Sequence, residues 1–141
     1  MGSGAVGIVL VVGAAVGVRH RRRDSRLAAG DGPRHDQDVT LDPALLTRLG
    51  VGPAPATLLQ FSTAFCAPCR AVRRVSTEVA ALVPGVQHVE VDAESHLDEV
   101  RELGIWRTPT LLVLDSGGRV VRRATGVPTK PHLIAVLGEV L

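Results

Sequence analysis

The hydrophobic and polar positions of this chain change repeatedly between two periods, which predicts alternating strands and helices. Short apolar or strictly alternating runs indicate strands, and apolar positions three or four residues apart indicate helices. Strands are expected at residues 57–62, 86–91, 110–114 and 120–124, with a short edge strand at 39–41. Helices are expected at residues 43–49, 68–82, 95–103 and 128–141. This order predicts an α/β domain in which helices join parallel central strands through right-handed crossovers.

The last two predicted strands are joined by Ser116-Gly117-Gly118, a sequence typical of a tight turn. A hairpin there adds antiparallel pairing at the edge, so the predicted sheet is mixed and flanked by helices. In the helix at residues 68–82, a periodic apolar face is expected to pack on this sheet. Its members are Val72, Val75, Val79 and Leu82.

Residues 2–18 hold no charged side chain, and as a helix they would span about 25 Å at about 1.5 Å per residue. Arginines follow at once, and their side chains can reach the lipid headgroups when a span is short. We interpret residues 1–18 as a single transmembrane anchor in contact with membrane lipid. A cleaved signal peptide is the first alternative, although its positive charge would precede the apolar segment. A buried soluble helix is the second, although five glycines would weaken it.

The basic cluster that follows, residues 19–26, sets the expected orientation. Positive charge on the carboxyl side of the anchor predicts that the remainder of the chain is cytoplasmic, with an extracytoplasmic location as the alternative. Residues 19–38 are polar, with Gly and Pro, and are interpreted as a basic stop and linker. Residues 39–141 form the predicted domain. A net charge of +2, with the arginines concentrated beside the anchor, does not indicate a nucleic-acid partner.

Cys66 and Cys69 are the only cysteines, and they lie where a predicted strand leads into a helix. The free N–H groups and the dipole at a helix N-terminus favour a thiolate, so the pair is a candidate redox dithiol. Such a pair can also supply half of a zinc site, but two further ligands would then be needed. It can also be a chemically silent feature of an interaction module.

Several motifs in the same order make residues 39–141 resemble the thioredoxin family. Phe65-Cys66-Ala67-Pro68-Cys69-Arg70 resembles the Trp-Cys-Gly-Pro-Cys-Lys site of that family. The segment from Gly104 to Thr110, which contains Thr108-Pro109, resembles the one that ends in its cis-proline. The resemblance implies a thioredoxin-like fold and a thiol–disulfide oxidoreductase.

The resemblance also implies roles for individual residues. Cys66 would be the exposed attacking thiolate and Cys69 the buried resolving thiol, with Pro68 shaping the turn between them. Pro109, if cis, would bring its loop beside the cysteines. The backbone of Thr108 would then hydrogen-bond an extended substrate, and Phe65 and Trp106 would contribute to an apolar docking surface.

This chain departs from the family pattern at several of these positions. Phe65 replaces the usual Trp, and Ala67 replaces the usual Gly, so the redox potential does not transfer. Gln60 stands where the family usually has a buried acid that helps to deprotonate the resolving thiol. Because Gln cannot act as a base, His88 is a candidate substitute if it points toward Gln60 and Cys69. Otherwise His88 is structural, and either substrate reduction is slower than in a general thioredoxin or the proton leaves through water.

The sequence therefore predicts a membrane-tethered thiol–disulfide oxidoreductase that reduces protein disulfides through Cys66 and Cys69. No organic cofactor and no metal are expected, and a reductase or a second dithiol protein would donate electrons. The alternatives are a thioredoxin-like interaction module without turnover, and an extracytoplasmic factor for disulfide formation or cytochrome maturation.

Overall fold

The computed structural model describes residues 39–141. The predicted membrane anchor and linker, residues 1–38, lie outside the described residues. Among the helices of residues 39–141, none combines the length and apolar character that crossing a bilayer requires.

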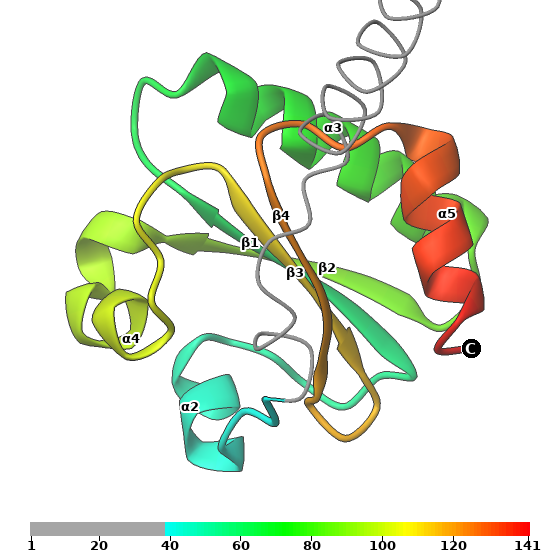
Figure 1. The fold of residues 1–141 in the computed structure, drawn as a ribbon, viewed down its shortest axis with the longest axis horizontal. Coiled ribbons are helices and arrows are strands. Elements are labelled where there is room, and N and C mark those ends of the chain that lie inside the picture. Colours follow the sequence, from blue (N-terminus) through cyan, green and yellow to red (C-terminus); the bar gives the residue numbers. More distant parts are fainter. Residues whose placement is uncertain (1–38) are drawn as a thin grey trace, which may run out of the picture. The chain divides into compact units, whose positions relative to one another are not determined.

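A four-stranded mixed sheet forms the centre of the described domain (Figure 1). Its strands are β1 (Ala56–Ser62), β2 (Val86–Asp92), β3 (Thr110–Asp115) and β4 (Val120–Thr125), in the spatial order β2-β1-β3-β4. β1 pairs with β2 in parallel, and β3 pairs with both β1 and β4 in antiparallel orientation. The mixed character of the sheet and the hairpin between β3 and β4 are confirmed.

The expectation that all helix-connected strands are parallel is wrong for β3, which runs opposite to β1. The chain between β2 and β3 contains the helix α4 (Leu97–Glu102), whose six residues rise only about 9 Å. β2 itself extends over about 23 Å. Because this short helix does not return the chain to the start of β2, β3 enters the sheet from the end where β2 leaves it.

Two predicted elements at the periphery are shorter in the structure. The expected strand at residues 39–41 is a single bridge between Thr40 and Arg119. The expected helix at residues 95–103 is divided into a 3₁₀ turn, η2 (Ala93–Ser95), and α4, with His96 in a non-helical conformation between them. The Asp92 carboxylate accepts hydrogen bonds from the Glu94 N–H and the Ser95 hydroxyl, which stabilises the separate turn.

The helices cover both faces of the sheet. α3 (Ala67–Leu82) and α5 (Lys130–Gly138) lie on one face, while α2 (Pro43–Arg48) and α4 lie on the other (Figure 1). Successive residues of β1 contribute to opposite faces: Leu58 packs in the cluster with α3 and α5, and Leu59 packs in the cluster with α2. The side chain of Gln60 therefore faces α3, on the same side as Leu58.

The periodic face of α3 is buried along most of its length, as predicted. Val72 and Val79 are fully buried, and Val75 packs against the same cluster. Leu82 is an exception, because 60% of its surface is exposed at the last residue of the helix. The Leu82 side chain lies outside this cluster, although Val83, the next residue, packs against it.

Candidate active site

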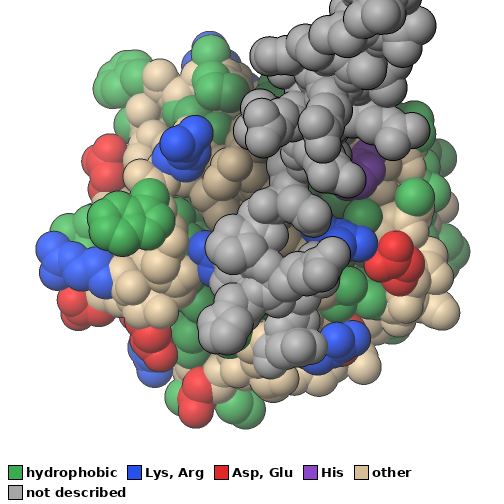
Figure 2. All heavy atoms as spheres, viewed as in Figure 1, with side chains coloured by type: hydrophobic (Ala, Val, Ile, Leu, Met, Phe, Trp, Pro, Cys, Tyr) green, Lys and Arg blue, Asp and Glu red, His purple; other side chains and the backbone are tan. Residues whose placement is uncertain are grey.

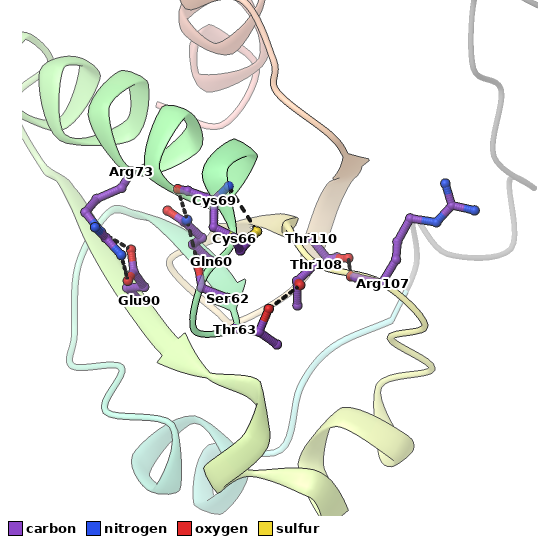
Figure 3. Close-up of a disulfide and its surroundings, with 10 residues drawn as sticks. All are labelled: Gln60, Ser62, Thr63, Cys66, Cys69, Arg73, Glu90, Arg107, Thr108 and Thr110. Atoms are coloured by element: carbon purple, nitrogen blue, oxygen red, sulfur yellow. Dashed lines mark hydrogen bonds and ion pairs between the residues drawn. A yellow bond between two sulfur atoms is a disulfide. The ribbon is translucent and has the colours of Figure 1, made fainter.

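Cys66 and Cys69 are joined by a disulfide of 2.06 Å at the start of α3 (Figure 3). Cys66 is the N-cap residue, and its sulfur accepts a hydrogen bond from the Cys69 N–H at 3.2 Å. Cys66 is half-buried, whereas Cys69 is only 1% exposed because it lies inside the first turn and faces the sheet. The two cysteines therefore differ in exposure, and the more exposed one lies at the positive end of the helix dipole.

Phe65 precedes Cys66 in an unusual backbone conformation, with φ of 58°. This left-handed region is uncommon for residues other than Gly and is often found at functional sites. The Phe65 ring is completely exposed, at 103% of its reference surface, so core packing does not explain the conformation. The next turn is regular, because Pro68 lies inside the first turn of α3, where a backbone N–H has no helical partner.

The loop before β3 supplies the second part of the site. The Thr108–Pro109 peptide bond is cis, as the resemblance implied. The Thr108 hydroxyl shares a 2.9 Å hydrogen bond with the hydroxyl of Thr63, which follows β1 (Figure 3). A second hydroxyl, that of Thr110, donates to the Arg107 carbonyl at 2.6 Å. These bonds fix the cis-proline loop and join it to the segment that leads to Cys66.

Two features of this loop suit contact with another molecule. Within residues 39–141, the main-chain N–H and C=O of Thr108 have no hydrogen-bond partner. Trp106, two residues earlier, is 95% exposed, which is exceptional for the largest apolar side chain. Phe61, in contrast, is fully buried and belongs to the core.

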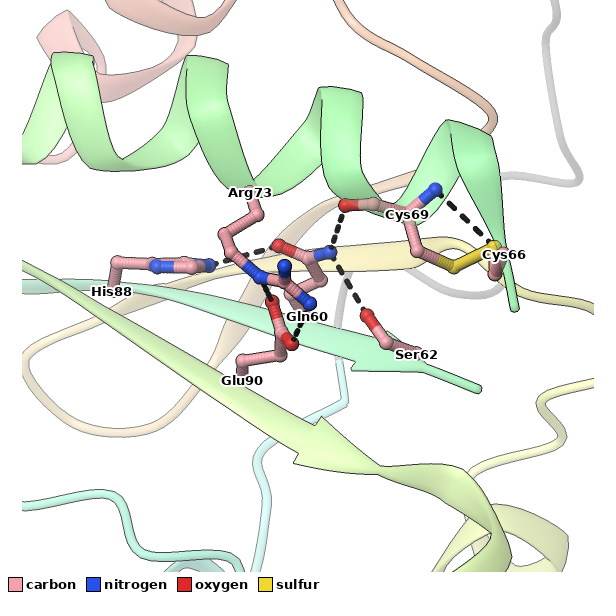
Figure 4. A network of polar contacts seen from close by, with 7 residues as sticks. All are labelled: Gln60, Ser62, Cys66, Cys69, Arg73, His88 and Glu90. Carbon is pink, nitrogen blue, oxygen red and sulfur yellow. Dashed lines mark hydrogen bonds and ion pairs between the residues drawn. A yellow bond between two sulfur atoms is a disulfide. The ribbon is translucent and has the colours of Figure 1, made fainter. Parts of the chain in front are cut away.

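Gln60 lies beneath the disulfide and forms a hydrogen-bonded network (Figure 4). Its side chain is 0% exposed. The amide nitrogen donates to the Cys69 carbonyl at 2.8 Å and to the Ser62 hydroxyl at 2.9 Å. The amide oxygen lies 2.9 Å from Nε2 of His88. All polar atoms of this buried amide are thus engaged, and Gln60 connects His88 to Cys69.

His88 lies on β2, at the partly buried edge of this network. Burial lowers the pKa of its imidazole below the ordinary value of 6.5; Glu90 opposes the shift and Arg73 adds to it. Glu90 and Arg73 form a bidentate ion pair with N–O distances of 2.6 Å, from β2 to α3. Burial therefore favours the neutral form of the His88 imidazole, whose contact in the site is Gln60.

The structure brings together most of the residues that the sequence singled out. Cys66, Cys69 and Pro68 lie in one turn, and Gln60 and His88 form one network beneath it. Sequence reasoning missed Thr63 and Ser62, whose hydroxyls become recognisable only when the loops and Gln60 are placed. Within residues 39–141, no three His, Cys, Asp or Glu side chains are grouped as metal ligands would be.

Comparisons with known proteins agree with this arrangement. The thioredoxin family model matches residues 51–139. A thioredoxin of Alicyclobacillus acidocaldarius is 34% identical over 85 residues, which cover 60% of this chain and 80% of that protein. A thioredoxin of Chlamydia trachomatis is 29% identical over 82 residues, which cover 58% of this chain and 79% of that protein.

Solved structures show the same fold at lower sequence identity. Chloroplastic thioredoxin z matches with a TM-score of 0.60 and 19% identity, covering 74% of this chain and 94% of that chain. Thioredoxin-2 of the malaria parasite matches with a TM-score of 0.56 and 16% identity, covering 61% and 84% of the two chains. Since the family model spans more than half of the sequence and includes the Cys66–Cys69 motif, this chain belongs to the thioredoxin family.

Proposed function

We propose that this protein is a thiol–disulfide oxidoreductase that reduces disulfides in other proteins and is tethered to a membrane. The observation that carries the proposal is the asymmetry of the dithiol. Cys66 is half-buried and accepts a hydrogen bond from the Cys69 N–H at the N-terminal end of α3, while Cys69 is almost fully buried. An N–H donor and the helix dipole favour the thiolate form, which is the nucleophile in disulfide exchange.

The proposed reaction has two exchange steps. The reduced Cys66 thiolate attacks one sulfur of the substrate disulfide, so a mixed disulfide forms and the other substrate sulfur leaves as a thiolate. The Cys69 thiol then loses its proton and attacks the Cys66 sulfur, which releases the second substrate thiolate and forms the Cys66–Cys69 disulfide. Two electrons pass to the substrate, whose thiolates take up two protons. The cycle uses neither a metal nor an organic cofactor.

We infer that the substrate is an extended protein segment that contacts the cis-proline loop. The unpartnered main-chain groups of Thr108 are suited to strand-like hydrogen bonds with such a segment. The exposed rings of Phe65 and Trp106 are suited to its apolar side chains. A reductase or another dithiol protein would return two electrons to Cys66 and Cys69 and complete the cycle.

The membrane part of the proposal rests on the sequence of residues 2–26. The uncharged segment is the proposed single-pass anchor, and the arginines after it favour a cytoplasmic domain. A reporter fused to the carboxyl end tests this orientation in cells. We expect the fusion protein to be recovered in the membrane fraction, with its reporter on the cytoplasmic side. A reporter on the external side would instead favour an extracytoplasmic factor.

The catalytic part is tested by insulin reduction with dithiothreitol as the electron source and the full chain in detergent. Wild-type protein is expected to accelerate precipitation of the insulin B chain, and Cys66→Ser is expected to abolish this acceleration. Cys69→Ser keeps the nucleophile without the resolving thiol, so it should accumulate a mixed disulfide with its substrate. Activity that survives Cys66→Ser would contradict catalysis through Cys66. A wild-type protein without activity would favour an interaction module without turnover.

A further inference from the structure

Gln60 connects Cys69 to His88 by hydrogen bonds, and the donor and acceptor of each bond can be assigned by starting from Cys69. The Cys69 carbonyl oxygen can only accept, so the Gln60 atom 2.8 Å from it is the amide nitrogen. The amide oxygen must then face His88, 2.9 Å away, and this oxygen can only accept. His88 Nε2 therefore carries a proton and donates it in a hydrogen bond to Gln60.

This polarity bears on what His88 can do. A histidine that acts as a base toward Cys69 would need an unprotonated nitrogen directed at the sulfur or at an intervening water. Nε2 instead donates to an amide, and the chain of hydrogen bonds ends on the Cys69 backbone carbonyl (Figure 4). The contacts of His88 thus suit a residue that orients Cys69 better than one that removes its proton.

The groups around His88 leave Gln60 as its hydrogen-bonding partner. Glu90, two residues along β2, accepts hydrogen bonds from Nε and Nη2 of the Arg73 guanidinium in a bidentate pair. Arg73 comes from α3 and Gln60 from β1, so each element packed against His88 contributes one of these polar groups. Arg73 thus engages the Glu90 carboxylate, and the His88 imidazole is directed to the buried amide of Gln60.

We propose that His88 is a positioning residue of the dithiol, which holds Cys69 in place through the amide of Gln60. The Gln60 bond fixes the carbonyl of Cys69, and the N–H of the same residue points to the Cys66 sulfur at 3.2 Å. A correctly oriented Cys69 N–H stabilises the Cys66 thiolate in the reduced protein. His88 therefore acts on the nucleophile through Gln60 and Cys69 without touching a reacting atom.

The test compares His88→Leu, which removes the donor, with His88→Gln, which retains a donor without the imidazole. The readout is the pH midpoint for alkylation of Cys66 by iodoacetamide in the reduced full chain, followed by site-resolved mass spectrometry. His88→Leu is expected to move this midpoint upward by about 0.5 to 1 pH unit, since a misoriented Cys69 N–H would lose its hydrogen bond to the Cys66 thiolate, which is worth about 1 kcal/mol. His88→Gln and the exposed control His132→Leu are expected to match wild type.

Two results would overturn the proposal: a wild-type midpoint in His88→Leu, or an equal shift in His88→Gln. Because alkylation requires no turnover of a protein substrate, this outcome is independent of the insulin assay for the proposed function. A second measurement uses the wild-type protein, so it does not depend on whether a variant folds. Nitrogen-15 NMR of the wild-type imidazole is expected to show the Nε2–H tautomer, and the Nδ1–H tautomer would be incompatible with donation to Gln60.

Discussion

Cys66 and Cys69 are three residues apart, yet they occupy very different environments. Helix α3 begins between them, so Cys66 remains at the cap while Cys69 has already turned toward the sheet. The residues on either side extend this difference, with the fully exposed Phe65 before the pair and the buried Gln60 beneath it. A change at one of these positions is therefore expected to affect either access to the dithiol or its orientation.

Thr108 is the residue through which the cis-proline loop is joined to the segment leading to Cys66. Thr108→Val keeps the shape of the side chain but removes the 2.9 Å bond to Thr63. A net loss of about 1 kcal/mol corresponds to a roughly fivefold weaker interaction. We expect KM for a protein disulfide to rise about fivefold, with little change in kcat, in steady-state insulin reduction.

Thr77 provides the matched control for this substitution. It is exposed on α3, and Thr77→Val changes the same hydroxyl to a methyl group away from the loop. The control should have the wild-type KM. Equal kinetics for Thr108→Val and wild type would show that the bond between the two hydroxyls does not organise the cis-proline loop for the proposed substrate.

At the level of elements, α2 depends on its cap. The Asp42 carboxylate accepts hydrogen bonds from the N–H groups of Ala44 and Leu45 at 2.7 and 3.4 Å. Pro43 occupies the first helical position. This short helix carries Leu45 into the apolar cluster beneath the sheet, where Leu49 also packs. Because a helix of six residues has little intrinsic stability, its cap and its buried leucines determine whether it forms.

Replacing Asp42 by Ala is expected to reduce the free energy of unfolding by about 1 kcal/mol, because two N–H groups lose their acceptor. Asp42→Asn retains an acceptor and should recover most of this stability. Urea unfolding followed by circular dichroism measures both variants. An Asp42→Ala midpoint equal to that of wild type would indicate that the buried leucines hold α2 without the cap.

The β-hairpin shows a different dependence on local sequence. Gly118 has φ of 80°, and a Cβ there would approach Cδ1 of Leu46 to 2.8 Å. The turn thus requires Gly for its backbone conformation, and its approach to α2 requires either Gly or a shift of the end of the Leu46 side chain. The paired glycines predicted the turn correctly, but only the packed structure reveals the second requirement.

At the level of the whole domain, three ionisable groups make stability decrease toward acidic pH. Burial lowers the pKa of His88 below 6.5, so the folded domain binds fewer protons than the unfolded chain in that region. A hydrogen bond from its own backbone N–H lowers the pKa of Glu99 below 4.5. Burial raises the pKa of Asp115, but hydrogen bonds from Arg119 and Gly117 outweigh it, and the result lies below 3.8.

These shifts predict two regions of acid sensitivity in the free energy of unfolding. His88 lowers stability as pH falls from about 6.5 through its depressed folded-state pKa. Glu99 and Asp115 stabilise the domain while they are ionised. This contribution is lost as the pH falls through their folded-state pKa values, which lie below that of His88. Urea unfolding at a series of pH values should show that His88→Gln removes the first decrease and keeps the second. If the free energy of unfolding of His88→Gln still fell with pH just below 6.5 as steeply as that of wild type, this assignment would be wrong. His132→Gln serves as the control.

Local pattern determined most elements of this domain. The apolar runs of β1 and β3, the periodic face of α3 and the Asp42-Pro43 start of α2 each express a preference of neighbouring residues. The spacing of Cys66 and Cys69 at a strand-to-helix turn likewise indicated a redox pair, because capping and the helix dipole are local effects.

The tertiary structure decided what depends on residues distant in the sequence. The direction of β3, the pairing of Thr63 with Thr108 and the exposure of Leu82 follow from how elements pack. Gln60 was recognised from the sequence as a missing base, but the sequence could not assign the direction of its hydrogen bonds. Those directions depend on the Cys69 carbonyl and on His88, which belong to different elements and meet only when α3, β1 and β2 pack together.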